Sequence, residues 1–428
     1  MTELNIQIEE LISKNATDFQ ISKVFKTYYK NYLDSIDTTV ETTGGKDFFI
    51  KHTKHTDKFL ILLYKYILRK NFGSHQPMST SIPISLIALG SYGREQLCIY
   101  SDIDIMILYE NIKGYNLKDI MEEFITLAWD CGLKLGSRVH ELKEIQDAVK
   151  EDITIKTSIL ESRLIYGSKI LWYGYENSLI KIRKTEQKEF ILEKLEEHKQ
   201  RLLKYPLKME PNIKDGYGGI REANMMYWMA NILYGVKNTK ELIGVQFTEE
   251  EFRKYRQALE FIFQVRNALH NIARKKQDQV TFDILPELSS KLGFKNRPRY
   301  TKDRLCMSKI LSSLHIIHNF TANMVKKFTR AVLFETSNIS KLKEYRFKKN
   351  LYIIGNTLYC SFSRKAQSLN SLLKELIELP SSVERFDRSY IYFASKSKLP
   401  NVQTKELKKT IKALLSKPNL YPVIKLIY

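Results

Sequence analysis

The sequence predicts an α+β fold in which a small mixed sheet with flanking helices is followed by a helical bundle. Two apolar runs rich in β-branched residues, ISLIALG and DIDIMILYE, are separated by about ten residues, as expected for neighbouring strands. Long stretches with apolar residues at helical spacing precede and follow these runs. The chain of 428 residues has room for two or three domains, each with its own core.

The same patterns divide the chain into four segments. We expect helices in residues 1–80, where DKFLILLYKYILRKN carries a broad apolar stripe. The sheet is expected within residues 81–180. Residues 181–340 show helical periodicity almost throughout and should form the bundle, while residues 341–428 should contain a β-hairpin plus helices.

Individual elements follow from the periodicity. After the second apolar run, LKDIMEEFITLAWDCGLKLG predicts an amphipathic helix, and SRVHELKEI opens with a third short strand. Residues 152–172, DITIKTSILESRLIYGSKILW, predict a return to helix. In residues 345–364 two strand-like runs flank Gly355-Asn356, a pair typical of a tight hairpin turn.

Composition and charge describe a globular chain. Apolar residues make up 43% and charged residues 27% of the sequence, which excludes an intrinsically disordered protein. The formal net charge of +21 favours an anionic partner such as nucleotide phosphate. The lysines are scattered and no RNA-reading motif accompanies them, so we do not expect nucleic acid as a partner.

Cysteine usage and hydropathy bear on the compartment. The four cysteines are far apart and form no CxxC pair, so buried reduced thiols and a cytoplasmic location are expected. The N-terminus is acidic and polar, without an apolar signal core. Because the sequence contains no run of 18 uncharged apolar residues, we expect neither a membrane span nor a membrane partner.

Two carboxylates interrupt the second apolar run. Side chains at positions i and i+2 of a strand lie on the same face, so Asp102 and Asp104 should project together while Ile103 and Ile105 point into a core. Carboxylates whose Cα atoms lie about 6–7 Å apart repel one another unless a cation lies between them. Mg²⁺ fits because it binds a few carboxylates together with substrate phosphates. The pattern predicts Asp102 and Asp104 as metal ligands and catalytic residues for phosphoryl or nucleotidyl transfer.

A glycine–serine pair ends the first apolar run. Gly90 allows the backbone to approach a phosphate closely, and Ser91 should begin a short helix whose amide groups bind phosphate oxygens. Arg94 is a candidate for a second phosphate contact, and Ser101 for capping or orienting the aspartates. A lone DxD is common, but its combination with a preceding apolar run that ends in Gly-Ser is far rarer.

These residues resemble a known family. GSYGREQLCIYSDIDIMILY is similar to the signature of the nucleotidyltransferase superfamily with the polymerase-β-like fold, and more narrowly to that of the bacterial PII-protein uridylyltransferases. The segments WDCGLKLG, EPNIKDGYGGIRE, VRNALH and VTFDILPELSSKLGF resemble that family in the same order, over roughly residues 20–420. The resemblance implies transfer of UMP from UTP to a tyrosine of a PII-type nitrogen-signalling protein, with Mg²⁺ or Mn²⁺ as cofactor.

The sequence departs from the family in three respects. The family usually has Gly-Gly where this chain has Gly90-Ser91, which is the usual form in the wider superfamily, and it commonly has GHSVR where residues 136–141 read GSRVHE. The superfamily often has a third carboxylate ligand on a strand beyond the helix; Glu141 and Asp152 are both candidates here, and Asp152 matches an acidic residue of the family. The full family enzymes continue into an HD hydrolase domain and two ACT domains, before which this chain stops. Residues 341–428 are therefore expected to be a lead-in to a missing HD domain, and no removal of UMP is expected.

A second unusual stretch, EPNIKDGYGGIRE, lies between two long helices. Lys214 and Arg221 are candidates for neutralising the triphosphate or the leaving pyrophosphate, Arg221 by a planar bidentate contact. The alternative is that the glycines only form a tight turn between helices and the charges pair locally. We favour the functional interpretation because the family resemblance is strongest here and in residues 90–104.

Other polar residues are interpreted structurally. Arg266 and His270 are four apart on a predicted helix and share a face, which favours a buried polar anchor between helices. His52 and His55 of KHTKH are expected to be exposed. Two alternatives to PII uridylylation stay open: nucleotide transfer to another acceptor, namely a protein, a small molecule or RNA, and a non-catalytic protein that binds a nucleotide or a partner.

Overall fold

The structure is a computed structural model. It describes residues 2–427 except 44, 74–76, 79–80, 113–115, 334–344, 362–363, 365–366 and 399–403. The chain divides into two compact units, Met1–His318 and Asn319–Tyr428. The predicted boundaries at 80/81 and 340/341 involve residues outside the described part, so the division into four segments stays a prediction.

Three helices occupy the N-terminal region: α1 (Thr2–Ser13), α2 (Asp18–Thr43) and α3 (Lys46–Phe72). The prediction that His52 is exposed is wrong. Its side chain is 1% exposed, and its Nδ1 lies 2.9 Å from the Tyr32 hydroxyl of α2. Tyr32 of the neighbouring helix and Phe48 of the same helix stack against this ring, and burial lowers the pKa of His52 to about 3.

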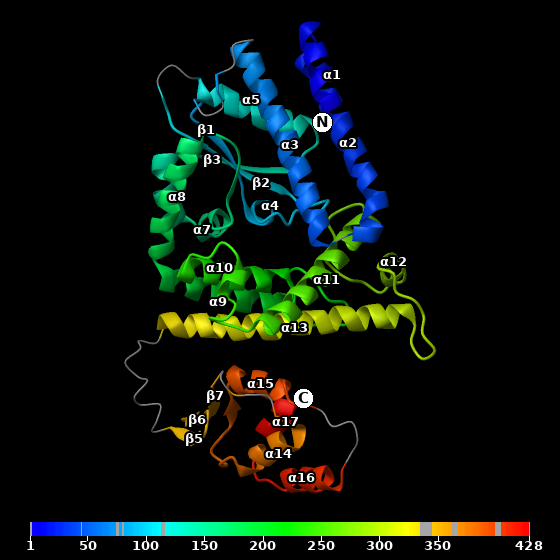
Figure 1. The fold of residues 1–428 in the computed structure, drawn as a ribbon, viewed down its shortest axis with the longest axis vertical. Coiled ribbons are helices and arrows are strands. Elements are labelled where there is room, and N and C mark those ends of the chain that lie inside the picture. Colours follow the sequence, from blue (N-terminus) through cyan, green and yellow to red (C-terminus); the bar gives the residue numbers. More distant parts are fainter. Residues whose placement is uncertain are drawn as a thin grey trace. The chain divides into compact units, whose positions relative to one another are not determined.

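The predicted mixed sheet is confirmed. Its strands are β1 (Ile84–Ala88), β2 (Ile103–Tyr109), β3 (Leu135–Glu141) and β4 (Arg163–Gly167), in the order β3-β2-β1-β4. Strand β1 pairs antiparallel with β2 and β4, whereas β2 and β3 are parallel. The parallel pair is possible because helix α5 (Leu117–Asp130) crosses between its two strands. In Figure 1, α3 and α5 lie on one side of this sheet and α7 and α8 on the other.

Strand β4 corrects the prediction of continuous helix in residues 152–172. The helix α7 (Ile153–Ile159) is present, but the chain then pairs with β1 through Ser85↔Gly167 before α8 (Lys169–Lys184) begins. This pairing joins segments about 80 residues apart in the sequence. Local periodicity could not reveal it, because RLIYG is short and its last residue leads directly into the next helix.

Both faces of the sheet are packed with apolar side chains. Ile103 and Ile105 of β2 face a core formed with α1–α3 and α5. Met106 and Leu108 face a second core that includes residues of α7 and α8. Because side chains alternate along a strand, Asp104 lies on the face of Met106 and Leu108, beyond the edge of their core.

Helices make up most of the remainder of the first unit. They are η1 (Leu142–Glu144), α6 (Ile145–Glu151), α9 (Gln187–Lys204), α10 (Ile220–Tyr234), η2 (Thr239–Leu242), α11 (Glu249–Ala273), α12 (Leu285–Lys291) and α13 (Lys302–Leu333), whose last turns belong to the second unit. Helix α10 contacts α8, α9 and α11. Its buried residues include Trp228. In Figure 1 the helix lies below the sheet.

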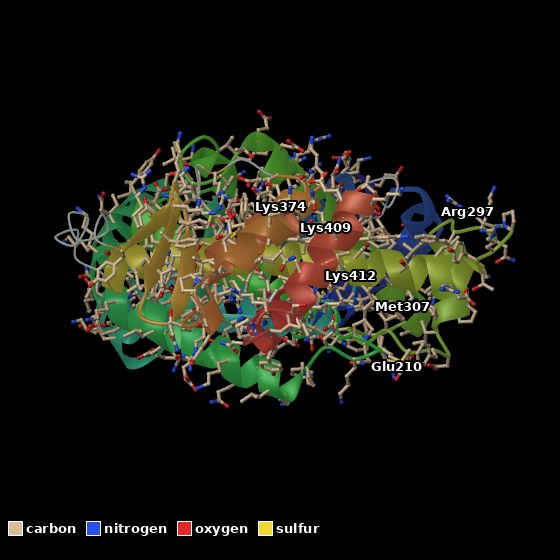
Figure 2. All side chains as sticks on the ribbon, turned by 90° about the horizontal axis from the view of Figure 1, so that it is seen from below. Glu210, Arg297, Met307, Lys374, Lys409 and Lys412 are labelled. Carbon is tan, nitrogen blue, oxygen red and sulfur yellow. The ribbon has the colours of Figure 1, made fainter. Side chains whose placement is uncertain are left out.

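The second unit contains a small sheet and four further helices. Its elements are β5 (Arg346–Lys348), β6 (Leu351–Ile354), β7 (Thr357–Cys360), β8 (Arg385–Phe386), α14 (Leu369–Glu378), α15 (Arg388–Ser395), α16 (Lys405–Leu415) and α17 (Tyr421–Ile427). The hairpin predicted at Gly355-Asn356 is confirmed, with Ile354 paired to Thr357. Lys409 and Lys412 project from α16 (Figure 2), whose buried side packs on the core of this unit.

Two further expectations concern cysteines and hydropathy. All four cysteines are buried free thiols, as predicted. Among the described residues, no helix combines the length and the apolar character that crossing a bilayer requires.

Candidate active site

The turn after β1 brings its backbone beside a carboxylate of β2. Leu89 donates its amide hydrogen to the carbonyl oxygen of Asp104 at 2.9 Å. Gly90 then adopts a positive φ of 56°, which glycine tolerates best, and the short helix α4 (Gly90–Gly93) follows. A Cβ atom at Gly90 would lie 3.4 Å from Asp104 Oδ2. The turn and the carboxylate are therefore in direct proximity, as the sequence predicts.

A second glycine leaves room on the other side of Asp104. In the parallel pairing of β2 and β3, Asp104 lies opposite Gly136, where a Cβ atom would approach Asp104 Oδ1 to 2.6 Å. Asp102 lies just before β2, and its Oδ2 accepts a hydrogen bond from the ammonium group of Lys276 at 3.0 Å. Burial, followed by the charge of Asp102, raises the pKa of Asp104.

This donor set fits a divalent cation. The carboxylates of Asp102 and Asp104 repel one another. The ammonium group of Lys276 lies beside Asp102, which shows that a positive charge is favourable at this place. The two flanking glycines leave the carboxylate of Asp104 unobstructed. Hard oxygen ligands of this type suit Mg²⁺ or Mn²⁺, which complete their shells with water and phosphate oxygens.

The carboxylates open into a cleft of about 360 Å³. It is lined by eight residues that the sequence singles out: Gly90, Ser91, Arg94, Ser101, Asp102, Asp104, Lys214 and Arg221. Six basic side chains and four acidic ones line it in total, the basic ones being Arg94, Lys194, Lys214, Arg221, Arg266 and Lys276. The excess of positive charge suits an anionic ligand.

Neither candidate for a third carboxylate ligand lines this cleft. Glu141 pairs with Tyr109 at the far end of β2, and it is five residues along β3 from Gly136, or about 16 Å. Its carboxylate pairs with Lys143 at 2.9 Å. This separation excludes Glu141 as a ligand of an ion bound to Asp104.

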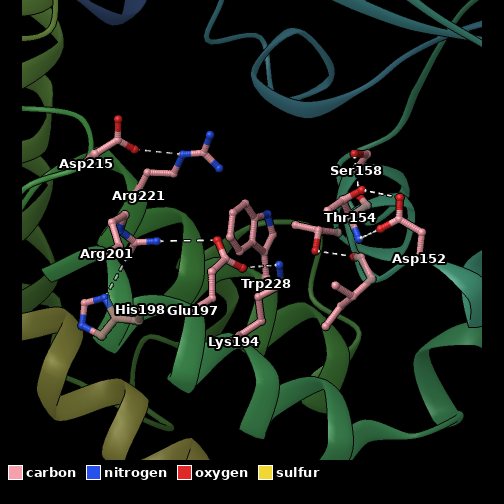
Figure 3. Close-up of polar contacts among 12 residues, drawn as sticks. Asp152, Thr154, Ser158, Lys194, Glu197, His198, Arg201, Asp215, Arg221 and Trp228 are labelled. Atoms are coloured by element: carbon pink, nitrogen blue, oxygen red, sulfur yellow. Dashed lines mark hydrogen bonds and ion pairs between the residues drawn. The ribbon is translucent and has the colours of Figure 1, made fainter. Parts of the chain in front are cut away.

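Asp152 caps helix α7 instead. Its Oδ1 accepts from the amide of Thr154 at 2.6 Å and its Oδ2 from the Thr154 hydroxyl at 2.7 Å (Figure 3). These hydrogen bonds lower the pKa of Asp152. With both oxygens engaged at a helix N-terminus, Asp152 has a structural role, and its geometry gives no support to its assignment as a metal ligand.

The sequence analysis did not single out Glu161, a buried carboxylate of the cleft. Its side chain is 3% exposed and forms an ion pair with Arg94. The same oxygen accepts a hydrogen bond from the indole nitrogen of Trp228. Arg94 is thus turned toward Glu161 at the edge of the cleft. An acidic residue between two apolar runs, as in SILESRLIY, was the available signal.

The glycine-rich stretch is joined to a second basic segment that follows α11. Ile213 donates its amide hydrogen to the carbonyl of Asp278 at 2.9 Å, and Val280 donates to Pro211 at 3.0 Å. The predicted local turn is also present, because Gly219 donates to the carbonyl of Gly216 at 2.9 Å. The two segments therefore form one wall of the cleft.

The carboxylate of Asp278 pairs with the basic side chains of this wall. It accepts from Arg266 Nε at 2.6 Å and lies 3.9 Å from Lys214 Nζ. His270 Nε2 is 3.6 Å away. The predicted burial of Arg266 and His270 is confirmed, although their partner Asp278 lies in the segment after α11 and not on a second helix. Burial alone would raise the pKa of Asp278, but the hydrogen bond with His270 and the charges of Arg266 and Lys214 hold that pKa below its usual value. The sequence analysis missed Asp278 and Lys276, for which the run RKKQDQ was the only signal.

The opposite wall combines hydroxyl groups with a paired lysine. Thr154 and Ser158 of α7 line the cleft near Trp228 of α10 (Figure 3). Lys194 of α9 is almost fully buried, lies 5.3 Å from the centre of the Trp228 ring system and pairs with Glu197 at 2.7 Å. This wall offers hydrogen-bond donors and one aromatic surface to a ligand.

Comparison with known proteins agrees with this geometry. A family model described as GlnD PII-uridylyltransferase matches residues 189–325. The predicted resemblance is confirmed. A bifunctional uridylyltransferase/uridylyl-removing enzyme of Novosphingobium aromaticivorans is 31% identical over 250 residues, which are 56% of this chain and 27% of that protein. Enzymes of the same name from Pseudomonas fluorescens and Pseudomonas entomophila are 32% identical over 263 residues and 36% identical over 217 residues.

The matched parts cover 60% and 49% of this chain, but only 29% and 24% of the two Pseudomonas enzymes. The chain therefore spans less than a third of each of these relatives. This similarity supports the interpretation of the chain as a nucleotidyltransferase.

Gly93 tests the close packing beneath the Gly90–Ser91 turn. A Cβ atom there would lie 1.8 Å from the carbonyl oxygen of Glu161 and 2.9 Å from that of Ala88, both in the backbone. We expect Gly93→Ala to reduce the free energy of unfolding by about 1–3 kcal/mol, because neither backbone segment can move away cheaply. Urea denaturation followed by circular dichroism measures the change.

Gly174→Ala is the matched control, since its added Cβ meets only the end of the Leu142 side chain, at 2.9 Å, and its helix position favours alanine. Equal stability of the two variants would contradict the packing of α4 described here.

Proposed function

We propose that this chain is a metal-dependent nucleotidyltransferase that transfers UMP from UTP to a tyrosine of a PII-type signalling protein, with release of pyrophosphate. The observation that carries the proposal is the proximity of Asp102 and Asp104 to the Gly90–Ser91 turn, at the edge of a cleft rich in basic side chains. The similarity to the PII uridylyltransferases supports the choice of nucleotide and acceptor.

The residues of the cleft divide the reaction between them. Ser91 and the amide groups of its turn bind the β- and γ-phosphates, and Lys214 and Arg221 neutralise the leaving pyrophosphate. Asp102 and Asp104 would hold Mg²⁺ or Mn²⁺, which would supply charge neutralisation at the α-phosphate and ease loss of the acceptor hydroxyl's proton to water.

The acceptor oxygen forms a bond to the α-phosphorus. The bond between that phosphorus and the bridging oxygen breaks, and pyrophosphate leaves with the electron pair.

The test is a transfer assay with defined nucleotides and acceptors. The purified chain is incubated with a PII-type protein, Mg²⁺ or Mn²⁺, and UTP, ATP, CTP or GTP in separate reactions, and the acceptor is then analysed by intact-protein mass spectrometry. We expect a mass gain of one UMP per modified subunit with UTP. A PII-type protein whose acceptor tyrosine is replaced by phenylalanine is the control.

Each alternative outcome has a defined meaning. A gain of another nucleotide would correct the base assignment, and a gain by the phenylalanine variant would correct the acceptor residue. Absence of transfer with every nucleotide would contradict the proposal.

A further inference from the structure

Lys276 holds one carboxylate of the proposed metal site. Its ammonium group lies 3.0 Å from Asp102 Oδ2. Both side chains are partly open to solvent, with 43% of the lysine and 52% of the aspartate exposed. Among the described residues, Lys276 is the ion-pair partner of Asp102. The contact therefore lies in the cleft, where ligands enter, rather than in the core.

The position of Lys276 is set by its backbone. The lysine lies two residues before Asp278, whose carbonyl accepts the amide hydrogen of Ile213. The side chain of Asp278 is bonded to Arg266, which is almost fully buried. This anchoring fixes the base of the Lys276 side chain beside the cleft while leaving its four-carbon stem free to change direction.

Lys276 and a metal ion compete for Asp102. The ammonium group lies on Asp102 Oδ2, and a divalent cation bound to the same carboxylate would be repelled by this positive charge at close range. The same wall carries Lys214 and Arg221, both of which line the cleft. A triphosphate bound between these groups offers Lys276 a new anionic partner within reach of its flexible stem.

We propose that Lys276 neutralises Asp102 in the free protein. When the metal and the nucleotide bind together, the lysine side chain moves away from Asp102 and its ammonium group pairs with a phosphate of the nucleotide. This inference rests on the proposed function and adds a binding rule to it. The metal alone binds weakly because it must displace Lys276, and the nucleotide strengthens metal binding because it provides the lysine with a phosphate.

The test measures metal binding directly. Titration of the protein with Mn²⁺, followed by electron paramagnetic resonance of the free ion, gives the Mn²⁺ affinity with and without UTP. Without UTP, we expect Lys276→Met to bind Mn²⁺ about threefold more tightly than the unsubstituted protein, the size expected for loss of an exposed ion pair. With saturating Mn²⁺, the same variant should bind UTP about tenfold more weakly, because one charged contact to phosphate is lost.

Two variants serve as controls. Lys275→Met removes an adjacent exposed lysine that does not line the cleft, and it should leave both affinities unchanged. Lys276→Arg keeps the charge and should keep the weak binding of Mn²⁺ alone. Circular dichroism establishes that all variants are folded.

The outcomes separate this inference from the proposed function. If Lys276→Met binds Mn²⁺ alone no more tightly than the unsubstituted protein does, the inference is wrong while the metal site stands. If the unsubstituted protein binds no Mn²⁺ even with UTP present, or if Asp102→Asn leaves Mn²⁺ binding unchanged, the metal assignment in the proposed function is itself overturned.

Discussion

Replacing Asp104 with asparagine is expected to lower the rate of UMP transfer by about 10³-fold or more, since loss of metal-ion stabilisation removes several kcal/mol of transition-state binding. The variant should fold normally. Asp104 lies between two glycines and faces the cleft, and its pKa is raised by burial and by the charge of Asp102. Removing this charge relieves a repulsion, so the urea midpoint should stay equal or rise slightly.

A mass-spectrometric time course with UTP and a PII-type acceptor measures the effect. The matched control is Asp147→Asn, which removes an exposed carboxylate paired with Lys150 on the surface of α6. It should transfer UMP at the unsubstituted rate. Substantial transfer by Asp104→Asn would remove Asp104 from the catalytic residues and with it the central assignment of the site.

Replacing Glu161 with glutamine is expected to reduce the free energy of unfolding by about 3 kcal/mol, because removal of one member of a buried ion pair leaves the other charge unpaired. Glu161 is 3% exposed and Arg94 is 11% exposed, so water compensates Arg94 poorly. Transfer activity should fall as well, since Arg94 and Trp228 both lose a charged partner at the edge of the cleft. Urea denaturation and the transfer assay measure the two effects.

A double substitution separates the two consequences. Replacing both Glu161 and Arg94 with glutamine removes both buried charges, so stability should recover by a large part of the loss. Activity should remain low, because the cleft has lost a cation near the phosphate-binding turn. A double variant as unstable as Glu161→Gln alone would show that the ion pair does not account for the loss.

Sequence patterns predicted the elements whose conformation depends mainly on residues close together in the sequence. The apolar run rich in β-branched residues placed β2, and the pair Gly355-Asn356 placed the C-terminal hairpin. Strand β4 was missed because its only pairing is with β1, far away in the sequence. His52 was misassigned for a related reason: its ring packs against Tyr32 of another helix, a contact that its own flanking residues do not reveal.

The candidate site shows the same division. Asp102, Asp104 and Gly90 follow from two strands and the turn between them, so a short sequence pattern contains most of the information. Glu161 and Asp278 belong to other parts of the chain. They matter to the site because they form ion pairs with Arg94 and Arg266. Neither third-ligand candidate lines the cleft, because acidic type and sequence position do not distinguish a helix cap or a distant strand end from a metal ligand.

The backbone hydrogen bonds between residues 211–213 and 278–280 make two distant stretches of sequence a single structural part. A chimera that takes only one of them from a related enzyme would combine segments whose backbone pairing does not match and would leave amide groups without acceptors beside the cleft. Attempts to transfer ligand specificity between such enzymes should therefore exchange both stretches together, because each stretch depends on the other for its backbone hydrogen bonds.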